Sequence, residues 1–416
     1  MLGIKTRILN HFKEMLEFGG LKNKPISLIE EGILTELAKK ELKKELEFVN
    51  LQSPVAKKAN PFAARIIKAT ADYMPNNLGN WSIKNPHTLT SRLELSLIEA
   101  IKRYYQCEKS VAGHFGSGTT EGNIYATWIG RNFLIKNLSL KNSEKIVLIK
   151  SCLAHYSIDK AADLVGIKIA IASIDSELFV LDSKELIKQL NSLYKSGLRG
   201  FIVPLTLGYT TTGTDDNYNE ICEIIEKFEK TYKDCKCFIW LDAAYSGISK
   251  IFTDNNFRPF SNEHIQLIST DFHKFLAVPY PASIMLYRKN LLNHIKKDIT
   301  YIDQLDTTLL GSRPGISDLA TWMSLISLDG RKMKKIINNS LNIKNNFLKR
   351  VSDENLNIKI INNKNSMQAC LVSNDKISER KLRNKYKLNF INYKLIVNNK
   401  VKLIKIYKLY FLPNFK

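Results

Sequence analysis

The sequence predicts an α/β protein with a mainly parallel sheet, and three observations support this prediction. The chain has 416 residues, which is long enough to bury a full hydrophobic core. Short apolar runs rich in β-branched residues alternate with amphipathic segments between residues 145 and 287. No apolar run approaches the ~20 residues that a bilayer-spanning helix requires. Such alternation is typical of a parallel sheet covered by helices on both faces.

The N-terminal segment, residues 1–75, is expected to be mainly helical. Residues 29–42 repeat apolar side chains at spacings of three and four, and Glu-to-Lys pairs line the polar face. Asn60 and Pro61 are expected to start another helix, because proline is tolerated in the first turn.

Residues 76–325 are expected to form one large domain, followed by a small basic α+β domain at 326–416. The large domain opens with a loop at 76–80, after which Thr90 or Ser91 caps a helix over 92–105. The predicted strands are 145–149, 201–205, 237–241, 266–269 and 282–287. The predicted helices between and before them are 124–134, 184–193 and 219–228.

The net charge of +22 is concentrated near the C-terminus. Residues 331–416 contain 21 Lys and Arg against 4 Asp and Glu, together with many Asn. No glycine-aromatic RNA-binding signature or stacking platform accompanies them, so we expect a solvated basic surface and no nucleic-acid partner. An anionic partner or a membrane surface is the alternative interpretation.

The cysteines and the N-terminus indicate a cytoplasmic protein. The six cysteines are scattered without a Cys-x-x-Cys pair, so we expect reduced thiols and no metal site. Met1 to Arg7 is not followed by an apolar signal region, and we expect no membrane anchor. Export by a route that leaves no such signal is the alternative.

Two predicted strands deliver polar side chains to one sheet edge. Asp242 follows the strand at 237–241, and Lys274 follows the strand at 266–269. Ligands of open α/β sheets bind at the carboxyl edge. A lysine there can form a Schiff base with a carbonyl, and an aspartate can pair with a protonated pyridine nitrogen, which are the groups that pyridoxal phosphate requires. Either residue alone is more often part of a surface salt bridge.

A glycine-rich turn, Gly116 to Asn123, opens the helix predicted at 124–134. Its glycines, including Gly118, allow the backbone to close around a phosphate, and free N–H groups at the helix start face it. The hydroxyls of Thr119 and Thr120 can add hydrogen bonds. The turn is not a Walker loop, because no lysine follows the second glycine.

Two further polar residues are expected at the same edge. His155 lies just after the strand that ends near Lys150, where it could stack on an aromatic ring and contact a substrate carboxylate. A lone histidine is more often structural. Thr210 lies in the polar turn at 207–216 and is positioned to line the same cleft.

Four segments together resemble the group II pyridoxal-phosphate-dependent amino acid decarboxylases, closest to the bacterial histidine decarboxylase and plant serine decarboxylase branch. These segments are Gly116–Asn123, His155–Ser157, Asp242–Ala244 and His273–Lys274, and their order and spacing agree over roughly residues 76–328. The resemblance implies fold type I with a mainly parallel seven-stranded sheet, and a homodimer with active sites at its interface. It also implies decarboxylation of an L-amino acid to an amine and CO2.

Carried over residue by residue, the resemblance implies specific roles. Lys274 forms the Schiff base with the cofactor, Asp242 pairs with the pyridine nitrogen, and Ala244 and His155 lie on the two ring faces. Gly311–Gly315 matches a segment that reaches the phosphate of the neighbouring subunit. The implied phosphate ligands are Thr119, Thr120 and His273. The full cofactor-binding set is Gly118, Thr119, Thr120, His155, Thr210, Asp242, Ala244, Ser269, His273, Lys274, Gly311 and Ser312.

Tyr301 is the expected donor of the proton that replaces the lost carboxylate. It lies in the connection at 289–306, where related decarboxylases carry a mobile catalytic loop, although loop packing is the alternative. Two residues depart from the family pattern. Asp271 stands where relatives commonly have Asn or Ser and would repel a phosphate unless it pairs with a cation. Tyr209 stands where many relatives have threonine.

Two other functions stay open from sequence. Gly311–Gly315 and Phe275–Pro281 also resemble sphingosine-phosphate lyases, which cleave a carbon–carbon bond, although those usually carry an N-terminal membrane anchor. A catalytically idle relative that acts as a binding protein is the second alternative. The substrate cannot be read from the sequence, but Asn76, Asn77 and His87 are expected to border the pocket.

Overall fold

The computed structural model describes residues 28–45, 50–54, 56, 58–78, 88–300, 304–373 and 375–414. The chain divides into two units, Met1–Ser53 and Pro54–Lys416. In the first unit, α2 (Leu28–Glu45) confirms the helix predicted at 29–42. The second unit contains all the elements described below.

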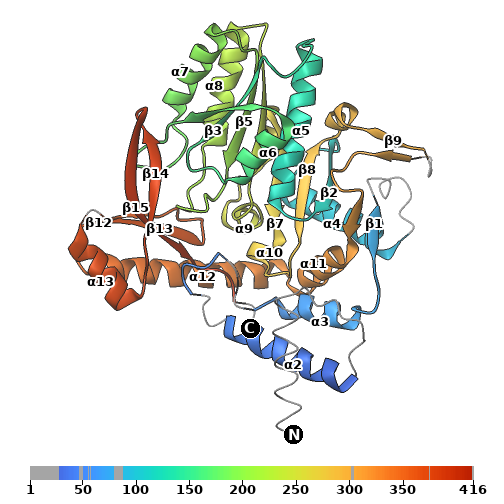
Figure 1. The fold of residues 1–416 in the computed structure, drawn as a ribbon, viewed down its shortest axis with the longest axis vertical. Helices are drawn as coiled ribbons and strands as arrows, with labels where there is room; N and C mark the ends of the chain where they lie inside the picture. Colours follow the sequence, from blue (N-terminus) through green and yellow to red (C-terminus); the bar gives the residue numbers. More distant parts are fainter. Residues whose placement is uncertain are drawn as a thin grey trace. The chain divides into compact units, whose positions relative to one another are not determined.

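A seven-stranded sheet forms the centre of the second unit (Figure 1). Its strands are β2 (Val111–Gly116), β3 (Ile146–Ser151), β4 (Lys168–Ala172), β5 (Gly200–Thr206), β6 (Lys236–Asp242), β7 (Ile265–Asp271) and β8 (Ser283–Arg288). The spatial order is β2-β8-β7-β6-β5-β3-β4. Only β8 runs antiparallel to its neighbours β7 and β2. The predicted mainly parallel, seven-stranded sheet is therefore confirmed.

Two strands of this sheet, β2 and β4, were not expected as strands. In β2 two glycines weaken the local strand signal, yet packing requires them. A Cβ at Gly113 would lie 2.5 Å from Leu286 Cδ2, and one at Gly116 would lie 2.3 Å from Met285 Cε. The partner strand β8 therefore dictates glycine where local propensity disfavours it.

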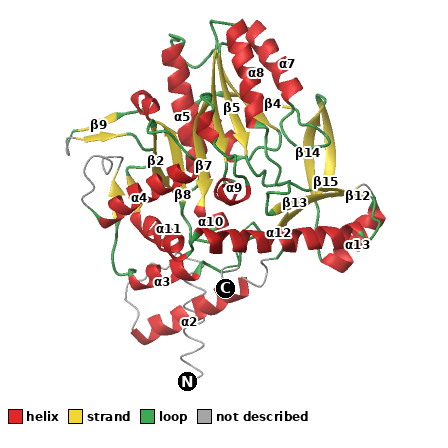
Figure 2. Cartoon of the chain, turned by 180° about the vertical axis from the view of Figure 1, so that it is seen from behind, coloured by secondary structure: helices red, strands yellow, loops and turns green. Residues whose placement is uncertain are grey.

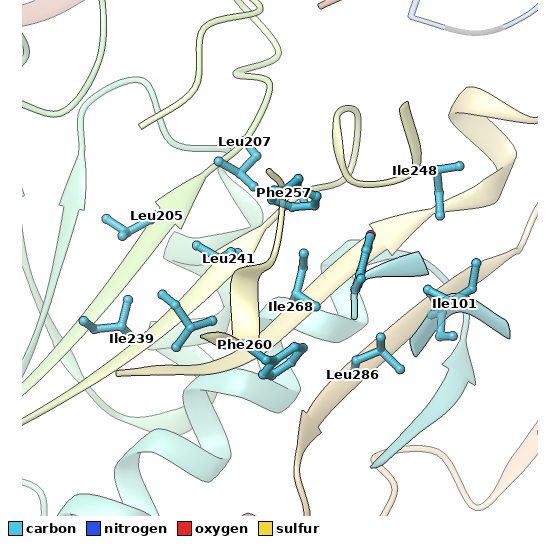
Figure 3. Packing of buried hydrophobic residues seen from close by; sticks show 14 of the residues in the cluster. Ile101, Leu205, Leu207, Ile239, Leu241, Ile248, Phe257, Phe260, Ile268 and Leu286 are labelled. Atoms are coloured by element: carbon cyan, nitrogen blue, oxygen red, sulfur yellow. The ribbon is translucent and has the colours of Figure 1, made fainter. Parts of the chain in front are cut away.

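Helices cover both faces of the sheet, because successive strand side chains point to opposite sides. Along β6, Ile239 and Leu241 join one core, and Phe238 and Trp240 join the other. Figure 3 shows part of the first core, including Ile239 and Leu241. This core includes side chains from α4 (Leu89–Tyr104), α7 (Ser183–Lys195), α8 (Tyr218–Thr231) and α9 (Gly247–Thr253). The second includes side chains from α5 (Thr119–Asn137) and α6 (Ser157–Val165).

Helix α5 lies unusually close to the sheet, and glycines permit this approach. A Cβ at Gly122 would lie 2.2 Å from the Oγ of Ser269 on β7, and one at Gly130 would lie 2.7 Å from the ring of Phe238 on β6. Real Cβ atoms cannot approach so closely, so larger residues would push the helix outward. The first turn of α5 is consequently held against the carboxyl ends of β6 and β7.

The start of α4 differs from the prediction of a cap at Thr90 or Ser91. The helix begins at Leu89, and the Thr88 hydroxyl accepts a hydrogen bond from the Ser91 N–H at 3.1 Å. Thr90 is instead buried in the first turn, where its hydroxyl donates to Asn77 Oδ1. The preceding α3 (Pro61–Ala69) begins as predicted.

The loop predicted at 76–80 is wrong for its first three residues. They form β1 (Asn76–Leu78), which pairs antiparallel with β11 (Ser312–Pro314). The partner strand is distant in sequence, so no local pattern could reveal the pairing.

The C-terminal region has the expected α+β content (Figure 2). An antiparallel four-stranded sheet with the order β12-β13-β15-β14 packs with long and short helices. The helix α11 (Gly315–Ser327) leads into this region. Its elements are α12 (Gly330–Ser352), β12 (Ile358–Ile361), β13 (Gln368–Ser373), α13 (Lys376–Tyr386), β14 (Ile391–Val397) and β15 (Lys400–Tyr410). Short elements before this region are η3 (Pro259–Ser261), α10 (Phe272–Phe275), η4 (Lys289–His294), β9 (Lys297–Ile299) and β10 (Gln304–Asp306). In the described part of the chain, no helix is both long and apolar enough to cross a membrane.

Candidate active site

A cavity of about 240 Å³ lies at the carboxyl ends of β5, β6 and β7. These strands end at Thr206, Asp242 and Asp271, all of which line it. The complete lining is Ser117, Gly118, Thr119, Thr120, His155, Ser157, Thr206, Gly208, Thr210, Asp242, Ala244, Tyr245, Asp271, His273, Lys274 and Tyr280. The structure thus brings together most of the residues that the sequence singled out, from segments far apart in the chain.

Some predicted site residues lie elsewhere. Ser269 is buried behind the start of α5, where its hydroxyl donates to Thr119 Oγ1 at 3.2 Å. Gly311 and Ser312 are exposed and do not line this cavity. Tyr301 and His87 lie outside the residues that the structure describes.

Asn76 and Asn77, expected to border the pocket, do not line it. Asn77 is buried, and its amide donates to Glu94 at 3.2 Å and to Asp318. Glu94 also forms an ion pair with Arg313 at 2.5 Å. A buried polar group must satisfy its hydrogen bonds, so Asn77 is committed to this network and is not free to contact a ligand.

Asp271, one of the two departures from the family pattern, is surrounded by hydrogen-bond donors, which include the Lys274 ammonium. Its Oδ1 accepts from the Thr119 N–H and the Thr119 hydroxyl, each at 2.8 Å. Its Oδ2 lies 3.1 Å from Lys274 Nζ and 3.2 Å from His273 Nε2. The Ala282 N–H donates to His273 Nδ1, which leaves Nε2 to donate to Asp271.

These partners decide the charge of Asp271. Burial alone would raise its pKa, but Lys274, His273 and the Thr119 hydroxyl together lower the pKa well below the usual value for aspartate. The repulsion anticipated for a carboxylate here is thus offset by the Lys274 ammonium and by the donors of His273 and Thr119. Both donors of Thr119 are engaged by Asp271, whereas Thr120 beside it lines the cavity.

Asp242 has a different environment. Its Oδ2 accepts from Asn123 Nδ2 at 2.9 Å, and its Oδ1 accepts from the Ala244 N–H at 3.3 Å. Burial raises the pKa of Asp242, and the Asn123 amide, Lys274 and His155 offset this only in part. A positive group placed beside Asp242 would therefore be strongly favoured electrostatically.

His155 follows β3 and is held by its own neighbours. Its Nδ1 lies 2.8 Å from the Ser157 hydroxyl, and the Ser157 N–H points at the same nitrogen at 3.3 Å. The Tyr156 ring lies 4.4 Å away between centroids. Burial lowers the pKa of His155, and Lys274 adds to this while Asp242 opposes it. The imidazole is thus favoured over the imidazolium.

Tyr209, the other departure, lies behind the cavity. It is buried, and its hydroxyl donates to both carboxylate oxygens of Asp216 at 2.9 and 2.7 Å. Asp216 also accepts from the Thr206 N–H at 2.8 Å. Burial raises the pKa of Asp216 to about 6, because its hydrogen-bond donors are neutral and only partly offset desolvation. Tyr209 therefore helps to shape the turn that presents Thr210.

The C-terminal region holds the same turn from the other side. The Tyr410 hydroxyl donates to the Thr210 carbonyl at 2.7 Å, and Asn363 Nδ2 donates to Asp215 Oδ2 at 2.8 Å. Lys250 Nζ forms an ion pair with Asp215 at 2.9 Å. The wall of the cavity that carries Thr210 therefore depends on residues from the far end of the sequence.

Sequence reasoning missed two tyrosines in the lining. Lys274 Nζ lies 4.2 Å from the centroid of the Tyr245 ring, and the Tyr280 ring lies 4.0 Å from the His273 ring between centroids, tilted by 34°. Tyr245 follows Asp242-Ala243-Ala244 directly, so its place after a strand end was an available signal. Tyr280 precedes a proline in an irregular stretch and carried no comparable signal.

The residues around the cavity fit pyridoxal phosphate. Lys274 supplies an amine, and Asp242 supplies a buried carboxylate without a cation in hydrogen-bonding contact among the described residues. Gly118 keeps the start of α5 open to the cavity: its φ of +135° strains any residue with a side chain. Hydroxyls of Ser117, Thr120 and Thr210 line the same space. This cofactor requires an amine for the Schiff base, a carboxylate for the pyridine nitrogen, and hydroxyl groups with a helix N-terminus for the phosphate.

Comparison with known proteins agrees with this chemistry. Residues 88–373 match the pyridoxal-dependent decarboxylase conserved domain. A tryptophan decarboxylase of Clostridium sporogenes is 34% identical over 260 residues, which are 61% of this chain and 61% of that protein. A histidine decarboxylase of Vibrio anguillarum is 26% identical over 300 residues, 71% of this chain and 73% of that protein. The chain thus spans about three-fifths of the length of the tryptophan decarboxylase.

A solved structure shares the fold across nearly the whole chain. The L-methionine decarboxylase of Streptomyces sp. 590 superposes with a TM-score of 0.77 at 15% identity, covering 94% of this chain and 93% of that one. At such low identity the likeness establishes the fold, which is the type I fold expected from the sequence. Because the conserved domain covers more than half of the residues, the chain belongs to the pyridoxal-dependent decarboxylase family.

Proposed function

We propose that the protein decarboxylates an L-amino acid to the corresponding amine and CO2, using pyridoxal phosphate. One observation carries the proposal: Lys274 and Asp242 line a single cavity at the carboxyl edge of the sheet. They do so within the segment that matches the decarboxylase domain. An amine and a buried carboxylate in one cavity are the groups that bind this cofactor covalently and electrostatically.

When bound, pyridoxal phosphate supplies an electron sink for the charge left on Cα as the carboxylate departs. Lys274 would hold the cofactor covalently. Asp242 would hold a proton at the ring nitrogen, because a buried carboxylate favours a neighbouring positive charge. The raised pKa of Asp242 in the absence of such a charge supports this role.

Other residues would position the cofactor and the substrate. His155 and Ala244 would lie against the ring, and Thr210 would add a hydrogen bond from the turn held by Tyr209 and Tyr410. The phosphate would be held by Gly118, Thr119, Thr120 and His273, with Ser269 supporting Thr119 from behind. For Thr119 to donate to the phosphate it must release Asp271, so Thr120, which also lines the cavity, is the more accessible donor.

The proposal extends to a homodimer, in which Gly311 and Ser312 serve the partner subunit's phosphate site. Their exposure outside the cavity of their own chain supports this assignment. Tyr301 is the proposed proton donor at Cα. We propose residues 76–325 as the cofactor-binding domain between a helical segment, 1–75, and a basic domain, 326–416. The six free cysteines favour a cytoplasmic location.

The alternatives differ in their products. A lyase of the sphingosine-phosphate type would release an aldehyde, and a binding protein would release nothing. The match to the decarboxylase domain and to relatives named for tryptophan and histidine favours loss of CO2. Those relatives also make tryptophan and histidine the first substrates to test.

The deciding experiment measures CO2 and amine release from each of the twenty amino acids by the purified full chain with pyridoxal phosphate. Lys274→Ala is the control, and we expect activity to fall by at least about 10⁴-fold, because the covalent link is lost. Borohydride should fix the cofactor to Lys274 in the unsubstituted protein. Cofactor fixed at Lys274 without CO2 release from any amino acid would overturn the decarboxylase proposal, and aldehyde from a phosphorylated amino alcohol would replace it by the lyase.

A further inference from the structure

Asn123 lies in the first turns of α5 and has no assigned role in the chemistry above. Its side chain is fully buried, and both N–H groups and the carbonyl oxygen of its amide form hydrogen bonds. Its Nδ2 donates to Asp242 Oδ2 at 2.9 Å and to Ser157 Oγ at 2.9 Å. Its Oδ1 accepts from the indole N–H of Trp240 at 3.1 Å. One side chain thus contacts residues from β6 and from the start of α6.

The chemistry of these partners fixes which way the amide faces. An indole N–H can only donate, so the carbonyl oxygen of Asn123 must face Trp240. Trp240 and Asp242 are two residues apart on β6 and point to the same side of the sheet. Both hydrogens of the amide nitrogen are therefore directed at Asp242 and Ser157. The close approach of α5 that Gly122 permits places the amide within reach of both.

The direction of the hydrogen bonds continues to His155. The Ser157 hydroxyl accepts from Asn123 and so has its own hydrogen available for His155 Nδ1, 2.8 Å away. The backbone N–H of Ser157, which can only donate, points at the same Nδ1. A nitrogen that receives two donors must present its lone pair. The proton of the neutral ring is then on Nε2.

We propose that Asn123 is a positioning residue that, through Ser157, holds His155 in the neutral Nε2–H tautomer while it anchors Asp242. One amide thereby couples the residue assigned to the ring nitrogen with the residue assigned to the ring face. The chain of donors runs in one direction, from Asn123 to Ser157 to His155. His155 then presents an N–H donor, and not a lone pair, at its far nitrogen.

This inference rests on the proposed function for its meaning in catalysis. A donor at His155 Nε2 suits an anionic partner, and the substrate carboxylate is the anion that the reaction brings to this cavity. A lone pair at the same atom would repel it. The tautomer is therefore expected to affect how the leaving carboxylate is oriented, and not whether the cofactor binds.

The test uses an isosteric substitution that reverses the direction of the hydrogen bonds between residue 123, Ser157 and His155. In Asn123→Asp the oxygen that replaces Nδ2 lies between Asp242 and Ser157, and the one proton that the two carboxylates share is held on the Asp242 side. Toward Ser157 this oxygen can only accept, so the Ser157 hydroxyl donates to it and the hydroxyl oxygen becomes the acceptor for His155. We expect His155 to change from Nε2–H to Nδ1-protonated, with the Nε2–H population falling about tenfold or more. The measurement is solid-state NMR of the full chain with ¹⁵N-labelled histidine, with His155 assigned by the His155→Asn spectrum.

Two further variants separate this mechanism from its competitors. Ser157→Ala removes the hydroxyl that connects Asn123 to His155, so adding Asn123→Asp should no longer change the tautomer of His155. A change that persists in the double variant would mean a through-space charge effect and would overturn the proposal. Thr127→Val removes another buried hydroxyl, which donates to the backbone carbonyl of Asn123 at 2.7 Å and does not contact its side-chain amide, and it should leave the tautomer unchanged.

The outcome is independent of the proposed reaction. Should Asn123→Asp not fold, Ser157→Ala alone should still raise the Nδ1–H population, because the hydroxyl donor is gone, but by less than Asn123→Asp, because the backbone N–H of the same residue still points at Nδ1. An unsubstituted protein with His155 already Nδ1-protonated would refute the inference and leave decarboxylation untouched. A tautomer switch in a protein that releases no CO2 would refute the proposed function and leave the inference standing. With activity present, we expect Ser157→Ala, which leaves the Asn123 contact with Asp242 in place, to lower kcat roughly fivefold while cofactor fixation at Lys274 persists.

Discussion

Two aspartates at the same edge of the sheet show how differently the fold treats buried acids. Asp242 ends β6 and Asp271 ends the neighbouring β7, and both line the cavity. They are almost equally buried, with 3% and 2% of their surface exposed. Yet the pKa of Asp242 is raised and that of Asp271 is lowered.

The difference comes from the partners. Asp271 has Lys274 and His273 within 3.2 Å and two donors from Thr119, which together outweigh the cost of desolvation. Among the residues that the structure describes, Asp242 accepts hydrogen bonds only from the Asn123 amide and one backbone N–H. One carboxylate is thus satisfied by the protein itself, and the other is left to be neutralised by something that enters the cavity. Burial alone does not decide whether an acid is structural or available for function.

Among substitutions of the buried acids, the largest expected effect is on turnover, from Asp242→Asn. Loss of the charge beside the cofactor ring should lower kcat by about 100- to 1000-fold, the range for removing one preorganised electrostatic group. Unfolding of the cofactor-free protein by urea should be affected less than by the matched substitution at Asp271, because the fold already disfavours the charge at Asp242. A variant with normal turnover, measured as CO2 release, would remove Asp242 from the site.

Asp271→Asn should act on stability. Losing the contacts with Lys274 and His273 should cost about 2 kcal/mol of unfolding free energy at pH 7. Because the folded pKa lies below the ordinary value, the stabilisation is present above about pH 4 and is lost as the pH falls through the folded pKa. Urea unfolding of the cofactor-free chain at pH 7 and at pH 3 measures this. A difference between variant and parent that does not shrink in acid would contradict the assigned ion pairs.

The smallest effect is expected at a third carboxylate, Asp216, whose side-chain and backbone donors are neutral. Its folded pKa of about 6 lies above the ordinary value, so its contribution to stability is full in acid and is lost as the pH rises through 6. Tyr209→Phe removes a donor to the carboxylate and should raise this pKa further. We expect a loss of about 1 kcal/mol at pH 8 and a smaller one at pH 5. Equal losses at both pH values would mean that the hydroxyl does not stabilise the charge.

Much of the fold and the centre of the site could be predicted from sequence, because the signals were local. Buried-type strands ending in polar residues located Asp242 and Lys274, and a glycine-rich turn before a helix located Gly118 and Thr120. Each is a short pattern whose physical reason lies within a few residues. These segments lie together because the carboxyl ends of neighbouring parallel strands are at the same edge of a sheet.

What sequence reasoning missed depends on long-range pairing. The strand β1 exists only because β11 pairs with it, and Asn77 is withdrawn from the pocket by Asp318. Asn123 was recognised only as part of a motif, because its role requires Trp240, Asp242 and Ser157 to meet around it. Lys274 and His273, which offset the burial of Asp271, are near it in sequence. The direction of the resulting pKa shift of Asp271, however, depends on side-chain geometry and on the Thr119 donors.

The hydrogen bond from the Tyr410 hydroxyl to the Thr210 carbonyl affects the order in which the protein can fold during its synthesis. A chain emerging from the ribosome carries its lysine, its acids and its glycine turn long before the segment with Tyr410 and Asn363 is synthesised. The parallel sheet can begin to fold during translation. The turn with Thr210, however, stays without its brace until the C-terminal strands arrive. During translation the core of the sheet should therefore form early and the catalytic activity should appear late, so that incomplete chains are compact but inactive.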